Sequence, residues 1–77
     1  MQNAPNKTLE LEFSHLFEKI SLLRTKAYET QLAAQNGREE LCDALFKDLQ
    51  KLLRDTVTSV ADIKRWTDEI RELGHKR

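Results

Sequence analysis

The residues from Cys42 to Leu73 carry a heptad repeat that constrains the fold of this 77-residue chain more than any other feature. Apolar or small residues recur there at alternating steps of three and four, which places them in one stripe along an α-helix that packs on another helix. The stripe comprises Cys42, Leu45, Leu49, Leu52, Thr56, Ser59, Ile63, Trp66, Ile70 and Leu73. Beside it, Phe46, Leu53 and Val60 repeat every seven residues. This extra width predicts contact with more than one neighbouring helix.

A second apolar repeat precedes the first and ends at a short polar turn. Its members are Leu9, Phe13, Leu16, Ile20, Leu23, Ala27, Thr30 and Ala34. Thr8 is predicted to cap the start of this helix. Gly37 can adopt the left-handed conformation that ends a helix, and Asn36 with Glu39 fits a capping box that starts the next one. Because short connections make helices antiparallel neighbours, the sequence predicts a helical hairpin.

The predicted fold class is therefore all-α, with helices at residues 8–35 and 38–73 and a turn at 36–37. Residues 1–7 contain the only proline and no periodicity, so we expect a disordered lead to a single domain, 8–77. Residues 55–61 are rich in β-branched and cap-prone side chains. A third, short C-terminal helix starting near Ser59 is the alternative to one continuous second helix. The small size and the single cysteine, which allows no internal disulfide, lead us to expect two hairpins associating into a four-helix bundle.

The register of the hairpin predicts which residues are left for a partner. Facing layers of an antiparallel pair have residue numbers with a constant sum, and a sum of 72 places Leu9 opposite Ile63. This register brings two oppositely charged pairs together, Lys19 with Asp55 and Lys26 with Asp48, and one pair of like charge, Glu12 with Asp62. It leaves three apolar residues beyond the end of the first helix, namely Trp66, Ile70 and Leu73. Because tryptophan is enriched at binding hot spots, these three are predicted to bind a partner. Apolar residues on other sides of the first helix join the prediction: Phe17, Leu22 and Tyr28.

No pattern in the sequence predicts a catalytic, metal or cofactor site. Glu12 and His15 have the Glu-x-x-His spacing of di-iron bundles. Phe13 and Leu16 define the inward face of that helix, however, so His15 is expected to point outward and to bind no metal. His75 lies in a charged tail, and no serine, cysteine and histidine are placed to suggest a catalytic triad. We expect no enzymatic activity, no cofactor and no small-molecule substrate.

The charge balance bears on the class of partner. Thirteen basic and thirteen acidic residues cancel, which removes the electrostatic basis for nucleic-acid or membrane binding. Apolar runs of only a few residues predict a cytoplasmic protein without a membrane span. The sequence thus predicts a non-enzymatic interaction module, an adaptor, co-chaperone or small regulator acting as a homodimer or on a larger protein. The alternative is a nucleic-acid-associated regulator that uses the basic side of the second helix: Lys47, Lys51, Arg54, Lys64, Arg65 and Arg71.

Overall fold

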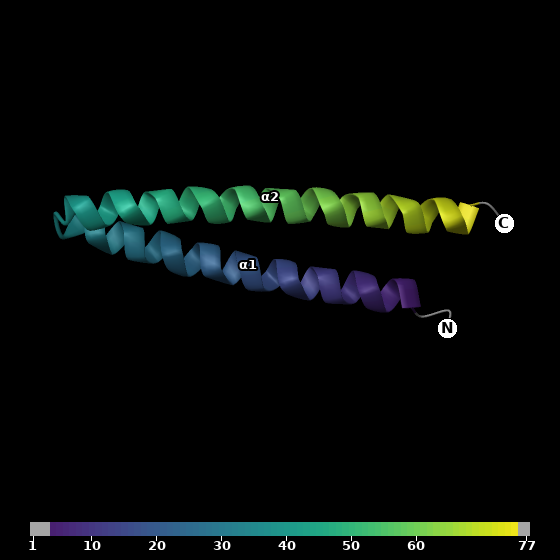
Figure 1. The fold of residues 1–77 in the computed structure, drawn as a ribbon. Helices are drawn as coiled ribbons and strands as arrows, with labels where there is room; N and C mark the ends of the chain where they lie inside the picture. The colour runs from purple at the N-terminus through teal and green to yellow at the C-terminus, as the bar shows by residue number, and fades with distance from the viewer. Residues whose placement is uncertain (1–3, 76–77) are drawn as a thin grey trace.

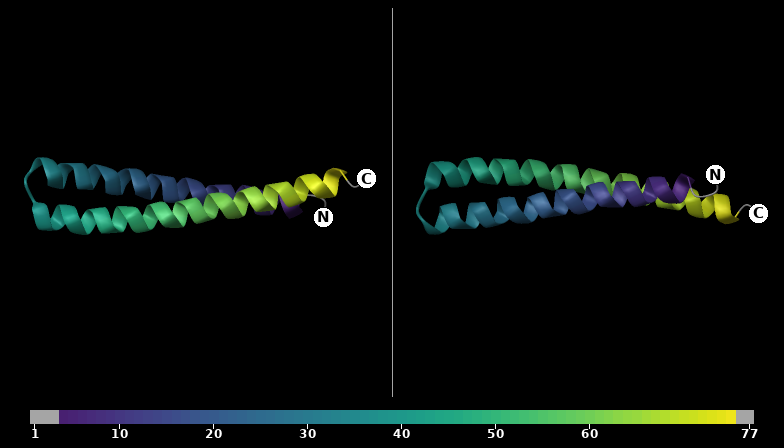
Figure 2. Two further views of the ribbon diagram at one scale, coloured as in Figure 1. Left: turned by 90° about the horizontal axis from the view of Figure 1, so that it is seen from above. Right: turned by 90° about the horizontal axis from the view of Figure 1, so that it is seen from below.

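The computed structural model describes the backbone of residues 4–75 and the side chains of residues 8–74. Helix α1 spans Ala4–Gln35 and helix α2 spans Glu39–His75. The two helices lie side by side and antiparallel, joined by a tight turn, in a rod with extents of 60 × 16 × 12 Å (Figure 1). Seen from above and below, they cross at a shallow angle near the end opposite the turn (Figure 2). The predicted all-helical hairpin is confirmed.

Helix α1 begins four residues earlier than predicted. Residues 4–7, assigned to a disordered lead, have a helical backbone, while residues 1–3 lie outside the described part of the chain. Pro5 is compatible with this start because the first turn of a helix needs no hydrogen bond from the missing proline N–H. Thr8 is therefore inside α1 rather than at its cap. At the other end, α2 continues through Gly74 to His75.

The turn is closed by a Schellman motif centred on Gly37. The amide of Arg38 donates to the carbonyl of Ala33 at 2.9 Å, and the amide of Gly37 donates to the carbonyl of Ala34 at 3.2 Å. Gly37 has a φ of 70°, which a residue without a Cβ adopts at little cost. The sequence prediction that Gly37 ends the first helix is confirmed.

A pair of glycine substitutions tests this turn. Gly37→Ala should lower the free energy of unfolding by about 1–2 kcal/mol, because an L side chain is strained at positive φ. Gly74→Ala is the matched control, since it lies within α2 and has no atom within 4 Å of an added Cβ. It should stabilise by up to about 1 kcal/mol. If urea titrations show that both substitutions change the free energy of unfolding in the same direction, the assignment of strain to Gly37 is contradicted.

Helix α2 is continuous through the segment that could have begun a third helix. Thr56 Oγ1 donates to the carbonyl of Leu52 at 2.7 Å, and Thr58 Oγ1 donates to that of Arg54 at 3.1 Å. These bonds satisfy the hydroxyl groups inside a helix, so the threonines do not need to compete for backbone groups as caps. The structure therefore has one continuous helix from Glu39 to His75, in place of the third helix that was the alternative.

The seam between the helices matches the prediction on α2 and differs from it on α1. On α2 the buried or half-buried residues are Cys42, Leu45, Leu49, Leu52, Thr56, Ser59, Ile63, Trp66, Thr67 and Ile70, of which Thr67 was not predicted. On α1 the corresponding residues are Leu9, Leu16, Lys19, Leu23, Lys26, Thr30 and Ala33. Four residues predicted for the α1 side of the seam are exposed instead, namely Phe13, Ile20, Ala27 and Ala34, and on α2 the predicted Leu73 is exposed too. Helix α1 is thus rotated relative to the prediction, and the stems of two lysines occupy the seam.

The predicted cross-helix ion pairs are also replaced by other contacts. Lys19 donates to Ser59 Oγ, one helical turn beyond Asp55. Lys26 pairs with Glu29 of its own helix at 3.4 Å, rather than with Asp48. The predicted register was therefore wrong in these two pairings.

Candidate interaction surface

The hairpin has a thin core. No described side chain is completely buried. Only five are close to it, and two of these are threonines: Leu16, Thr30, Ala33, Thr56 and Ile63. Large apolar side chains therefore remain on the surface, and their arrangement identifies the candidate functional surface.

A groove near the ends of the helices, away from the turn, places residues of both helices on one side of the hairpin. We call this end the open end. The floor of the groove is formed by Phe13 and Leu16 of α1 and by Val60 and Ile63 of α2. Phe13 and Val60 thus lie on the same side of the hairpin.

The heptad repeat extends this side along the molecule. Residues seven positions apart keep the same place relative to the partner helix, so Ile20 follows Phe13, while Leu53 and Phe46 continue the line of Val60. Phe17 and Val57 lie farther out on the same side. The ring centroids of Phe13 and Phe17 are 6.2 Å apart. We define the apolar face as Phe13, Phe17, Ile20, Phe46, Leu53, Val57 and Val60. Each of the seven side chains is between 38% and 62% exposed.

The two ends of this side differ in the size of their side chains and in the charged residues that border them. At the open end, Lys64, Asp68 and Arg71 border the groove. At the turn end, the corresponding hollow has small side chains on its floor, Ala34 and Cys42 among them. Charged residues border this second hollow too: Arg38, Glu39 and Asp43.

The opposite side of the hairpin is more polar. A hollow there is lined by Glu29 and Leu32 of α1 and by Leu41 of α2. Four acidic residues continue the seven-residue line of Leu41 along α2: Asp48, Asp55, Asp62 and Glu69. We call this line the acidic edge. Leu22 lies on this side as well, because it is two residues, or about 200°, from Ile20 around α1.

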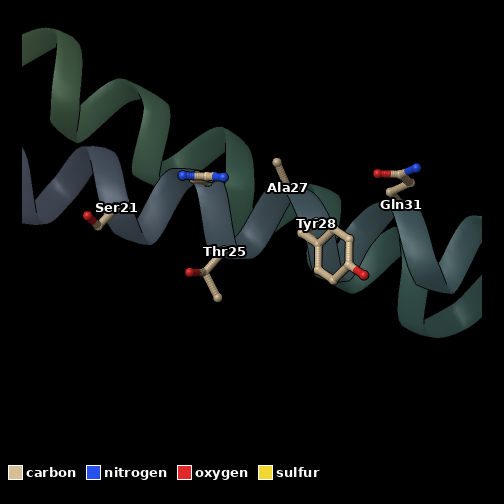
Figure 3. Close-up of a pocket in the computed structure, with 6 residues that line it drawn as sticks. Ser21, Thr25, Ala27, Tyr28 and Gln31 are labelled. Carbon is tan, nitrogen blue, oxygen red and sulfur yellow. The ribbon is translucent and has the colours of Figure 1, made fainter.

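The six residues predicted to bind a partner do not form one site. Phe17 belongs to the apolar face, and Leu22 lies on the other side of the hairpin. Tyr28 projects from α1 away from α2, beside a shallow hollow also lined by Ser21, Thr25, Ala27 and Gln31 (Figure 3). The remaining three lie near the end of α2: Trp66, Ile70 and Leu73.

The predicted overhang of α2 is shorter than expected. Because α1 starts at Ala4, it extends along α2 farther than the predicted register allowed, and Trp66 and Ile70 are half-buried. Trp66 Nε1 is buried and has no hydrogen-bond partner among the described residues. Leu73 is 65% exposed, near the end of α2 that extends past α1 (Figure 1). The partner-binding role of these three residues stays a prediction.

The sequence did not predict the apolar face as one surface, although six of its seven residues, all except Val57, were singled out separately. Phe13 and Ile20 were assigned to the seam, and Phe46, Leu53 and Val60 to a second helix contact. The usable signal was the width of the stripe on both helices, because one neighbouring helix covers only part of so wide a stripe.

The residues weighed for metal or phosphate chemistry are exposed. Glu12 and His15 are exposed, and within residues 8–74 no group of three or more potential metal-ligating side chains occurs. On the basic side of α2, Lys64 Nζ lies 2.8 Å from Asp68 Oδ2, and Arg65 Nη2 lies 3.3 Å from Asp62 Oδ1. The hydrogen bond from Lys64 lowers the pKa of Asp68, so this carboxylate stays charged beside the lysine. Within the described residues, neither helix has a stretch long and apolar enough to cross a membrane.

Comparison of the chain with protein families, curated proteins and solved structures finds no match.

Proposed function

We propose that the chain is a non-enzymatic helical interaction module, which works by burying the apolar face against another protein surface. A second copy of the chain and a larger protein are the two classes of partner. The observation that carries the proposal is the gathering of seven large, exposed apolar side chains on one side of the hairpin. Contiguous exposed apolar surface of this kind is typical of protein-binding sites.

The chemistry of the face supports a protein partner. Three of its seven residues are phenylalanines, which offer large contact areas at low conformational cost. Fully burying a side chain such as Phe, Leu or Ile contributes about 1.5–3 kcal/mol relative to its exposed state. Burial of the half-exposed face would therefore contribute several kcal/mol to an association. The roles that we propose for such a module are those of an adaptor, a co-chaperone or a small regulator.

The nucleic-acid alternative has less support. Two of its six basic residues, Lys64 and Arg65, already contact carboxylates on their own helix. Phosphate binding would require these contacts to break or to be shared. Retention of the chain on a phosphate matrix is a simple test. We expect elution at low salt. Retention that falls steeply with salt would favour the nucleic-acid alternative.

Site-specific photo-cross-linking tests the proposed function. A photoreactive phenylalanine analogue is placed at Leu53 of the full chain, expressed in the cells of its source. We expect covalent protein adducts, because Leu53 lies at the centre of the apolar face. The matched control is Leu22, a leucine on the other side of the hairpin with a similar exposure, 55% against 52%.

The comparison between the two positions decides the proposal. Adducts formed at position 53 and not at position 22 support the apolar face as the binding surface. Equal adduct yields at both positions, or none at position 53, would contradict it. Adducts at position 22 alone would favour the sequence prediction that Leu22 binds the partner.

A further inference from the structure

We infer that the apolar face is covered by a second copy of this chain, with the turn of each hairpin lying over the open end of the other. This inference rests on the proposed function and names the partner. It specifies a two-fold symmetric dimer in which α1 packs on α1 of the second copy and α2 on α2. All neighbouring helices of the resulting four-helix bundle are antiparallel.

The surface area of the hairpin argues for a partner as large as the hairpin itself. The chain exposes 6,550 Å², whereas a folded monomer of 9.0 kDa exposes about 4,900 Å². The excess of about 1,700 Å² is roughly twice the area that each partner buries in a standard interface. If each of two chains buried this area, the total would lie within the range of obligate homodimer interfaces. A single docked helix would cover only part of it. A second hairpin has the length and the width that the face requires.

The two helices turn their wide apolar stripes toward the same side of the hairpin. On α1, the line of Phe13 and Ile20 lies next to the seam residue Leu16. On α2, the line of Leu53 and Val60 lies next to the seam residue Ile63. Each helix therefore has one apolar flank that contacts its neighbour and one that faces solvent. In a four-helix bundle each helix has two neighbours, which is the arrangement that covers both flanks.

Side-chain size favours the arrangement with the turn over the open end. A two-fold interface must be complementary to itself. On α1 the large residues Phe13, Phe17 and Ile20 lie toward the open end, and the small residues Ala27 and Ala34 lie toward the turn. Antiparallel packing of α1 on α1 places the large half of each helix over the small half of the other.

Charge favours the same arrangement. The open end of this side is bordered by Lys64 and Arg71, with Asp68 beside them, and the turn end by Glu39 and Asp43, with Arg38 beside them. A two-fold axis near Leu53 places Asp43 of each copy near Lys64 of the other. Placing turn over turn would instead bring like charges together, which opposes association.

Sizing of the full chain is the first test. Sedimentation equilibrium should give twice the monomer mass at micromolar concentration. Leu53→Glu should weaken the dimer at least a hundredfold, because it buries a carboxylate near the two-fold axis. Leu22→Glu should leave the dimer unchanged. A monomer mass at every concentration would overturn the inference.

Cross-linking tests the arrangement without disturbing the apolar face. Asp43→Cys and Lys64→Cys are made separately in a Cys42→Ala background, mixed, and treated with a short bis-maleimide. We expect the mixture to give the 43–64 cross-link and neither variant alone to give a comparable yield. With turn over turn, the two positions would be about 31 Å apart along the bundle, and the 43–64 cross-link would be absent.

The outcomes separate this inference from the proposed function. A dimer that lacks the 43–64 cross-link overturns the arrangement. A monomer whose position 53 forms adducts with another protein overturns the second copy and leaves the proposed function supported. A monomer that forms no adduct at position 53 contradicts both.

Discussion

Replacement of Ile63 by alanine should lower the free energy of unfolding by about 2–5 kcal/mol. Ile63 is 5% exposed and is one of the few large side chains that the hairpin buries. The loss combines the transfer of its methyl and methylene groups with the cavity that they leave. Because a core of this size contributes only about 3–5 kcal/mol of net stability, the variant should be largely unfolded, as measured by circular dichroism during urea titration.

Leu73→Ala provides the matched control for the Ile63 substitution. It shortens a side chain of the same size at a position that is 65% exposed, so the free energy of unfolding should change by about 0.5 kcal/mol or less. A loss as large as that of Ile63→Ala would contradict this expectation. It would show that another chain covers the end of α2, as the sequence prediction for Leu73 states.

Dilution should lower the melting temperature of the full chain. If folding is coupled to dimerisation, a hundredfold dilution reduces the stability of the dimer by about 2.7 kcal/mol. With the entropy of unfolding expected for two chains of this length, the melting temperature should fall by about 5–10 °C. Circular dichroism melts over the concentration range provide the measurement.

A melting temperature that stays constant over this range would show that the hairpin folds without a second copy. The Leu53→Glu variant provides the control for this measurement. Any folded form that remains should melt at the same temperature at every concentration, because its association has been removed.

The heptad repeats and Gly37 carried enough information to predict the hairpin. The nine residues between Cys42 and Ile70 that the heptad repeat assigned to the seam are buried or half-buried there. The turn was predictable because a single glycine between two long helical repeats has few structural roles other than ending a helix. Helix continuity at Thr56 and Thr58 was harder to predict, because their bonds to backbone carbonyls form only once the helix exists.

The rotation of α1 could not be read from the sequence. Its apolar residues form a stripe wide enough to point in several directions, and both Ile20 and Lys19 were acceptable neighbours of Leu16 and Leu23. The choice depends on contacts made by α2, such as the bond from Lys19 to Ser59. The predicted register relied on ion pairs at the surface, which contribute only about 0–1 kcal/mol each and therefore select a register weakly.

The acidic edge has a consequence for how far assembly can proceed. A rod whose two sides were equally apolar could add further rods without limit and form sheets or fibres, and exposed leucines do lie on the side opposite the apolar face: Leu22, Leu32 and Leu41. Here the side opposite the apolar face has carboxylates at seven-residue steps from Asp48 to Glu69. Two rods that met along this side would bring carboxylates close together at a cost in free energy. If the apolar faces of two copies meet as proposed, growth is therefore expected to stop there, which favours a closed particle over a filament.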